Sequence, residues 1–206
     1  MEIKKLLYNY FNILPSEVLV NGISKVNSCT KTCFLEGDEN NITLIFNQEI
    51  KSCYNMFMNC GNITYIDLSN FDASNVTNME NMFDSCSSLK RINFENINTS
   101  SLEHIEGLFY ECIELTSIDL SNLNFSKVVG MRIMFMNCIN LEAINFGNIN
   151  TSSVESMSSL FYNCYKLTSI DLSNFNTSKV KDMGWMFLGC SNLEKINFGN
   201  INTSSV

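Results

Sequence analysis

One set of polar residues recurs at a fixed interval in this sequence and could bind a ligand; we call such a set of equivalent positions a column. Aspartate and asparagine alternate at 26-residue intervals at six positions: Asp67, Asn93, Asp119, Asn145, Asp171 and Asn197. Oxygen atoms of this kind bind hard cations, so the column could be a cation-binding or ligand-binding stripe. Alternation also places every carboxylate beside an amide that can donate a hydrogen bond, which separates the charges and permits close stacking. The favoured interpretation is a structural ladder, with the stripe as the alternative.

Residues that serve as catalysts or metal ligands are scarce elsewhere. His104 is the single histidine, and its segment SLEHIEGLF places it on the outer side of an expected helix, as a solvated surface residue. No phosphate-binding loop or dinucleotide fingerprint is present. Cys29 and Cys33 are four residues apart, but no second pair at zinc spacing follows. The sequence therefore predicts a protein without enzymatic activity, catalytic residues, metal or cofactor.

Most of the cysteines belong to a second column. Six of the nine recur every 26 residues: Cys60, Cys86, Cys112, Cys138, Cys164 and Cys190. They fall on the apolar stripe of each unit, so we expect them to be buried and reduced, as small apolar core residues. Any disulfide is expected among Cys29, Cys33 and Cys53, where three cysteines would leave one unpaired.

These columns belong to a 26-residue repeat, of which residues 167–192, LTSIDLSNFNTSKVKDMGWMFLGCSN, are one unit. Ile170 and Leu172 alternate around Asp171, which indicates a short strand. The apolar residues at 180, 183, 186, 187 and 190 recur at helical spacing, which indicates an amphipathic helix. A serine precedes each expected helix and is read as its N-cap: Ser74, Ser100, Ser126, Ser152, Ser178 and Ser204. The predicted fold is an α/β solenoid, a right-handed leucine-rich-repeat-like coil with a parallel β-sheet on one face and short helices on the other.

A 52-residue period overlies the repeat. Units reading IDLSNF alternate with units reading INFGNI, so large and small apolar residues should interdigitate between layers, and Leu123 breaks the pattern. An asparagine follows every strand and is expected to form a structural ladder: Asn70, Asn96, Asn122, Asn148, Asn174 and Asn200. N-glycosylation sequons also recur in register, at Asn98, Asn124, Asn150, Asn176 and Asn202. The favoured interpretation is that these triplets form the turn and the helix cap, and the alternative is that they are glycosylated in a secreted protein.

The chain divides into residues 1–53, expected to cap the solenoid with a strand pair, and residues 54–206, the repeats. Residues 17–24 and 41–47 are strand-like, with turn signals at residues 37–40. The last unit stops at Val206, before its expected helix, so we expect a truncated repeat whose uncovered apolar end self-associates end to end.

Composition excludes several partners. The chain is 45% hydrophobic, which predicts a folded protein, and its net charge of -8 offers no basic patch for nucleic acid or anionic lipid. No run reaches the roughly 18 apolar residues of a membrane helix, and the N-terminus does not read as a signal peptide. We therefore expect no nucleic acid and no membrane insertion.

The repeat resembles a known family through L-x-x-I-D-L-S-N-F-x-T-S-x-V-x-x-M-x-x-M-F-x-x-C, which is legible at residues 167–190 and, with substitutions, five times upstream. The units are similar to the leucine-rich repeats of the bacterial surface protein A (BspA-like) family. The resemblance implies a surface or extracellular module for adhesion or recognition, without enzymatic activity, that binds a protein or glycan across the concave face. The alternative is an architectural spacer with no ligand of its own. The strand positions expected on the concave face carry few of the aromatic and arginine residues that usually dominate binding energy.

Overall fold

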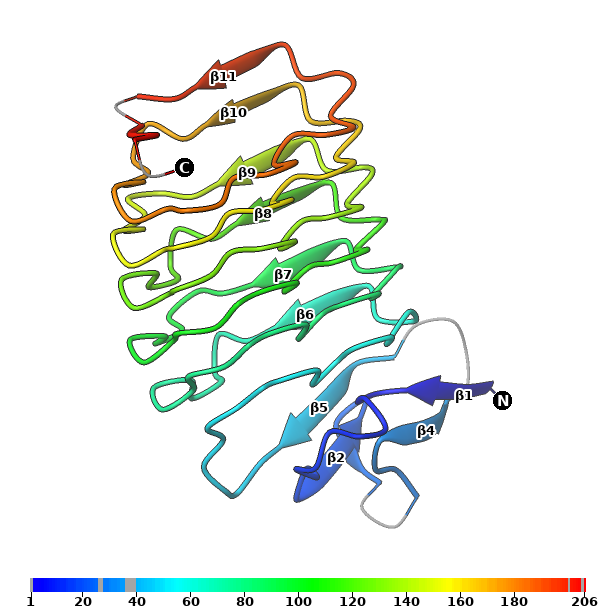
Figure 1. The fold of residues 1–206 in the computed structure, drawn as a ribbon. Coiled ribbons are helices and arrows are strands. Elements are labelled where there is room, and N and C mark those ends of the chain that lie inside the picture. Colours follow the sequence, from blue (N-terminus) through cyan, green and yellow to red (C-terminus); the bar gives the residue numbers. More distant parts are fainter. Residues whose placement is uncertain (1, 26–27, 36–39, 200, 205) are drawn as a thin grey trace.

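The computed structural model describes residues 2–25, 28–35, 40–199, 201–204 and 206. Figure 1 shows a stack of coils with a small group of strands at the end that holds the N-terminus. That group contains β1 (Glu2–Lys5), β2 (Glu17–Val20), β3 (Ile23–Ser24), β4 (Thr32–Leu35) and β5 (Ile42–Ile45). Each coil of the stack contributes one short strand: β6 (Tyr65–Asp67), β7 (Arg91–Asn93), β8 (Ser117–Asp119), β9 (Ala143–Asn145), β10 (Ser169–Asp171) and β11 (Lys195–Asn197).

The N-terminal strands form a cap over the first coil. Strand β2 pairs antiparallel with both β3 and β5, and β1 pairs antiparallel with β4. The strands expected within residues 17–24 and 41–47 are thus confirmed, whereas the turn signals at residues 37–39 lie outside the described residues. Leu7 and Phe11 join the main core beside Met56, and the Tyr8 N–H donates to the Met56 carbonyl at 2.9 Å. These contacts cover the first apolar layer, as a solenoid requires.

The strands of the stack pair in twos. Strand β6 pairs in parallel with β7, β8 with β9, and β10 with β11, each over three residues in register. Within each pair, the N–H of the residue after the first strand donates to the second strand's last carbonyl, as from Leu68 to Asn93 at 2.9 Å. Among the described residues β7 and β8 are not paired, nor are β9 and β10. The 52-residue period of the sequence is therefore also the period of strand pairing.

The predicted α/β solenoid with short helices is wrong, because the described residues contain no helix. The segments expected to be helical are runs of turns. Along residues 79–86, the N–H groups of Met79, Asn81 and Phe83 donate to carbonyls of the next coil, while those of Met82 and Asp84 donate three residues back. A helix would need all of these donors for its own carbonyls four residues back. Left-handed residues at Asn81 and Ser85, with φ of 51° and 56°, also interrupt any helix.

The close approach of the coils explains the absence of helices. We call the side of the stack formed by these runs of turns the turn side. Six phenylalanines stack along it, with ring centroids 5.4–5.8 Å apart between neighbours: Phe57, Phe83, Phe109, Phe135, Phe161 and Phe187. A helix with its side chains is about 10 Å wide, so helices cannot stack at about half that spacing. Turns that exchange hydrogen bonds with the next coil fit the spacing. They form a continuous series of parallel bridges through Ser52, Asn78, His104, Gly130, Ser156 and Asp182.

The predicted burial of the cysteine column is confirmed. Cys60 to Cys164 of this column are buried and free, and Cys190 in the last coil is partly buried and free. The Cys112 thiol donates to the Phe83 carbonyl at 3.2 Å, and Cys86, Cys138, Cys164 and Cys190 repeat this bond in their own coils. Burial raises the pKa of Cys138 to about 12, which keeps the unreactive thiol form. In the cap, Cys29 and Cys33 form a disulfide, and Cys53 is free and buried.

The serines predicted as helix caps have another role. There is no helix for them to cap in the described residues, and the backbone N–H of each is itself held by a side chain two residues earlier. Asn124 Oδ1 accepts from the Ser126 N–H at 2.9 Å, and Asn98, Asn150, Asn176, Asn202 and Asp72 act in the same way. These are Asx turns, so the in-register N-x-S triplets have a structural reason.

Leu123, which breaks the apolar pattern, has a compensating partner. Phe125 stands two residues later, where Thr99, Thr151 and Thr177 stand in other coils, and its ring is 2% exposed. Thr151 accepts a hydrogen bond from the Asn176 N–H at 2.8 Å, whereas Phe125 fills the equivalent space with apolar volume. In this coil the aromatic residue therefore stands two positions later than in the coils of Phe71 and Phe175, and the smaller Leu123 stands at the earlier position.

Candidate ligand-binding face

The Asp/Asn column lies on the solvent side of β6 to β11. In β6, Ile66 points into the core and Asp67 points out, because successive residues of a strand face opposite sides. The column residues are exposed except Asn93, which is partly buried. We call this solvent side of the six strands the strand face. The structure thus brings the predicted site residues Asp67, Asn93, Asp119, Asn145, Asp171 and Asn197 into one row.

Hydrogen bonds within the row follow the pairing of the strands. Asn93 Nδ2 donates to Asp67 Oδ1 at 3.1 Å, and Asn197 Nδ2 donates to Asp171 Oδ1 at 3.1 Å. Each aspartate also accepts from the backbone N–H two residues later, as Asp67 does from Ser69 at 2.9 Å. The bonds from Ser69 and Asn93 lower the pKa of Asp67 below its usual range. These hydrogen bonds between neighbouring strands favour the ladder over a cation-binding stripe.

A shallow hollow interrupts the strand face where β7 and β8 fail to pair. It has a volume of about 410 Å³ and is lined by residues of β7, β8 and β9. Its lining residues come from three strands: Arg91, Ser117, Asp119, Ala143 and Asn145 point outward, whereas Ile92, Ile118 and Ile144 stand at the inward position. The Arg91 guanidinium lies 5.6 Å from the centroid of the Tyr65 ring, so an aromatic side chain flanks the rim. The outward side chains can hold a ligand with hydrogen-bonding groups, and they include no nucleophile paired with a base.

The coils match a family model, described as Mycoplasma protein of unknown function, DUF285, over residues 51–145 and 139–206. The chain belongs to the DUF285 family. The matched residues include every strand of the stack and leave β1 to β5 outside. No curated protein and no solved structure matches the chain. The BspA-like resemblance stays a prediction.

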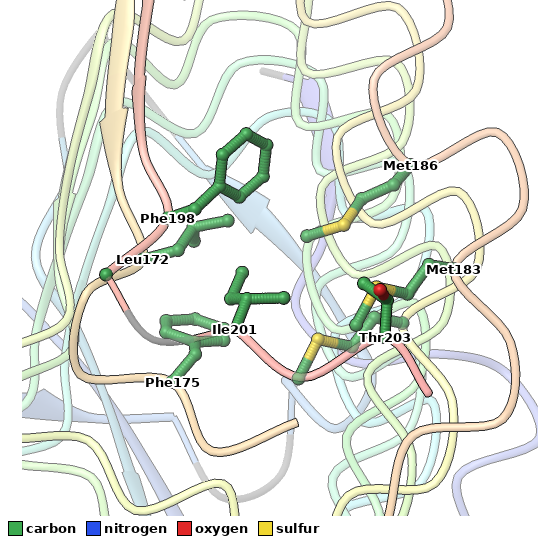
Figure 2. A pocket seen from close by; sticks show the side chains of 9 residues that line it. Leu172, Phe175, Met183, Met186, Phe198, Ile201 and Thr203 are labelled. Atoms are coloured by element: carbon green, nitrogen blue, oxygen red, sulfur yellow. The ribbon is translucent and has the colours of Figure 1, made fainter. Parts of the chain in front are cut away.

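A second hollow lies at the far end of the DUF285 coils. It has a volume of about 270 Å³ and is lined by Met157, Leu172, Phe175, Met183, Met186, Phe198, Gly199, Ile201 and Thr203. Figure 2 shows Phe198 and Ile201 approaching it from one side and Met183 and Met186 from the other. Phe198 is 47% exposed, so apolar side chains are in contact with solvent here.

The asparagine ladder expected after the strands is not where the sequence placed it. Asn70, Asn96, Asn122, Asn148 and Asn174 are exposed, and Asn200 lies outside the described residues. Asn174 Nδ2 donates to the Gly147 carbonyl at 3.2 Å. A ladder runs on the turn side instead, where Asn163 Nδ2 donates to Asn137 Oδ1 at 2.9 Å and Asn137 Nδ2 donates to Glu111 Oε1 at 3.3 Å. Aligning all 26 columns of the DUF285 repeat would have revealed this alternative.

His104 is not the solvated surface residue that the sequence predicted. It is partly buried on the turn side, and one ligand atom from each of Glu80, His104 and Glu106 lies within 4.8 Å of the others. The stacking of neighbouring DUF285 coils creates this cluster, since Glu80 and Glu106 are 26 residues apart. The sequence contains this cluster only as residues at equivalent or nearby positions of two successive repeats, and not as a motif of neighbouring residues. None of the described residues belongs to a helix that could span a membrane.

Proposed function

We propose that this chain is a non-catalytic recognition module of a surface or secreted protein, which binds a protein or glycan through the strand face. The observation that carries the proposal is the hollow lined by β7, β8 and β9, which includes the interruption of the sheet between β7 and β8 and the side chains of Arg91 and Asp119. The location at the surface rests on the BspA-like resemblance.

The side chains at this hollow are suited to polar ligands. Tyrosine and arginine are over-represented among residues that dominate binding energy, and Tyr65 and Arg91 are both exposed and adjacent. Asp119 of β8 offers a carboxylate and Asn145 of β9 an amide to the same hollow. Such a set can bind the hydroxyl groups of a glycan or the backbone of a protein loop. A pure spacer has no need for it.

The test is binding to arrayed glycans and to immobilised extracellular matrix proteins. The parent chain, the variant Tyr65→Ala/Arg91→Ala and the matched control Arg132→Ala should be compared, because Arg132 is also exposed but lies on the turn side. We expect the double variant to lose at least about tenfold in affinity and the control to lose nothing. A parent chain that binds none of these ligands would favour the spacer. Equal losses in both variants would remove the strand face from the proposal.

We also propose that the apolar hollow at the end of the coils associates with the same surface of a second copy. The exposed Phe198 and the outer edge of β11 are the groups that a second copy would cover. Two copies of one surface can meet through a twofold interface. The sulfur-containing Met183 and Met186, which line the hollow, can adapt to such a contact.

A further inference from the structure

Three metal-ligating side chains converge on the turn side, away from the strand face. Glu80 comes from one coil, and His104 and Glu106 come from the next. One ligand atom of each lies within 4.8 Å of the other two, and all three residues are partly buried. Ligand atoms about 2.1 Å from a tetrahedral metal ion lie about 3.4 Å apart, so small side-chain rotations would close the set around an ion.

Neighbouring groups hold the two carboxylates toward the cluster. Asn78 Nδ2 donates to Glu80 Oε2 at 2.9 Å, and the Ile105 N–H donates to Glu106 Oε2 at 3.2 Å. A Cβ atom added at Gly130 would contact the Glu106 carboxylate, so this glycine leaves the space that the carboxylate occupies. The backbones of Asn78, His104 and Gly130 are joined by parallel bridges. The ligands therefore project from a fixed part of the fold, as a preorganised site requires.

The chemical types of the three side chains suit a transition metal ion. Two carboxylates and an imidazole in one partly buried site are a common ligand set for a divalent transition metal. Later coils do not repeat the full set, since Ser156 and Ser158 stand at the equivalent positions in one coil and Asp182 and Gly184 in the next.

We propose that Glu80, His104 and Glu106 form a binding site for a divalent transition metal ion, with zinc as the expected ion. Three protein ligands leave the fourth tetrahedral position to water. The imidazole favours zinc over calcium or magnesium, which prefer six or more oxygen ligands. The bound ion would join two neighbouring coils and so stabilise the stack on its turn side. Asn78 acts as a positioning residue through Glu80.

The experiment is calorimetric titration of the full chain with zinc chloride after treatment with a chelator. We expect one ion per chain, a rise in melting temperature with zinc concentration, and no saturable binding of calcium or magnesium. His104→Ala and the double variant Glu80→Gln/Glu106→Gln should each lose at least about a hundredfold in affinity, and Asn78→Ala about tenfold. The matched control is Glu103→Gln, because Glu103 is an exposed glutamate beside the cluster and lies outside the ligand set.

A second measurement keeps the proposal falsifiable if a variant folds poorly. Cobalt(II) added to the parent chain should give visible absorption typical of a tetrahedral site with nitrogen and oxygen ligands, without the intense band of thiolate ligation. Acidification should release the ion, because the ligands must be deprotonated to bind it. The proposal is overturned if the parent chain binds no zinc, if folded His104→Ala binds it as tightly as the parent, or if the cobalt spectrum shows thiolate ligands.

Discussion

The strand face and the turn side of the same coils are built on different periods. On the turn side, bridges run through every coil from Ser52 to Asp182, and the phenylalanine rings stack without interruption. On the strand face, three-residue strands pair only in twos, and the sheet is interrupted between β7 and β8 and between β9 and β10. The continuous side therefore holds the coils together, and the interrupted side has room for variation.

The difference follows from the side chains. The turn side repeats one phenylalanine and one cysteine in each coil, so each layer presents an almost identical surface to the next. The strand side alternates, with Leu68 and Phe71 in one coil and Phe94 and Ile97 in the next, and alternates Asp67 with Asn93 outside. Identical layers stack as a uniform column, whereas alternating layers form pairs. The hollow at Arg91 lies at a boundary between two such pairs.

The largest effect should come from breaking the continuous side. Phe109 is fully buried and stacks on Phe83 at 5.6 Å and Phe135 at 5.4 Å. Phe109→Ala should lower the free energy of unfolding by about 3–5 kcal/mol, because it removes ring contacts on both sides and leaves a cavity. Urea denaturation followed by circular dichroism measures the change. Ser117→Ala, in the exposed part of β8, is the control and should change stability by less than about 0.5 kcal/mol. Similar losses in the two variants would contradict the inference that the turn side holds the coils together.

A smaller effect should follow from removing the alternation on the strand face. The double variant Asn93→Asp/Asn145→Asp would place five carboxylates in one row and remove the amide that donates to Asp67. Within the pairs β6–β7 and β8–β9, strands about 4.8 Å apart would then carry like charges, and stability should fall by about 1 kcal/mol for each of these two pairs. The loss should shrink in high salt, since exposed charges are screened. If millimolar calcium stabilises the variant far more than the parent, the column has a cation-binding capacity that the ladder interpretation lacks.

The inward residues were predictable from the sequence, and the backbone of the turn side was not. The spacing of Met79, Met82, Phe83 and Cys86 identified the buried side, and all four are fully buried. The same spacing suits a helix and a run of turns, because both return a side chain to the core after three or four residues. The left-handed backbone at Asn81 decides between them, and one asparagine in a window of apolar residues is a weak local signal.

The candidate sites show the same limit. The Asp/Asn row was predictable because each residue repeats in its own column. The hollow at Arg91 depends on where the strands stop pairing, and that follows from packing between layers rather than from any single residue. The cluster around His104 needed the register between two coils, which places Glu80 and Glu106 side by side.

End-to-end association of two copies should depend on the strand side of the last coil and not on its turn side. Phe198 lines the hollow from the strand side, whereas Trp185 on the turn side is 72% exposed and lies outside the lining. Phe198→Ser should shift a concentration-dependent dimer toward monomer in sedimentation velocity, because the apolar lining is lost. Trp185→Ser is the matched control and should leave the dimer in place. A parent chain that stays monomeric at all concentrations would refute the association.

The smallest effect should appear in the pH dependence of the turn side without metal. Because burial and Glu80 raise the pKa of Glu106, the folded state disfavours its ionised form. Below the ordinary glutamate pKa of about 4.3, Glu106 is protonated in the folded and unfolded states and imposes no cost. As the pH rises through the raised folded value, stability is lost. The neighbouring ionisable side chains are those of Glu80, His104 and, one coil further in the same column, Arg132.

Glu106→Gln removes this cost while keeping an oxygen that can accept from the Ile105 N–H. With a chelator present, the variant should therefore be more stable than the parent at pH 7 by no more than about 1 kcal/mol, because partial exposure screens the charges. The gain should vanish near pH 4, and saturating zinc should reverse the order by stabilising the parent alone. Urea midpoints across this pH range measure the difference, with Glu103→Gln as the control that should show no such crossover. A variant that is less stable than the chelated parent at pH 7 would show that the ionised Glu106 stabilises the turn side by itself.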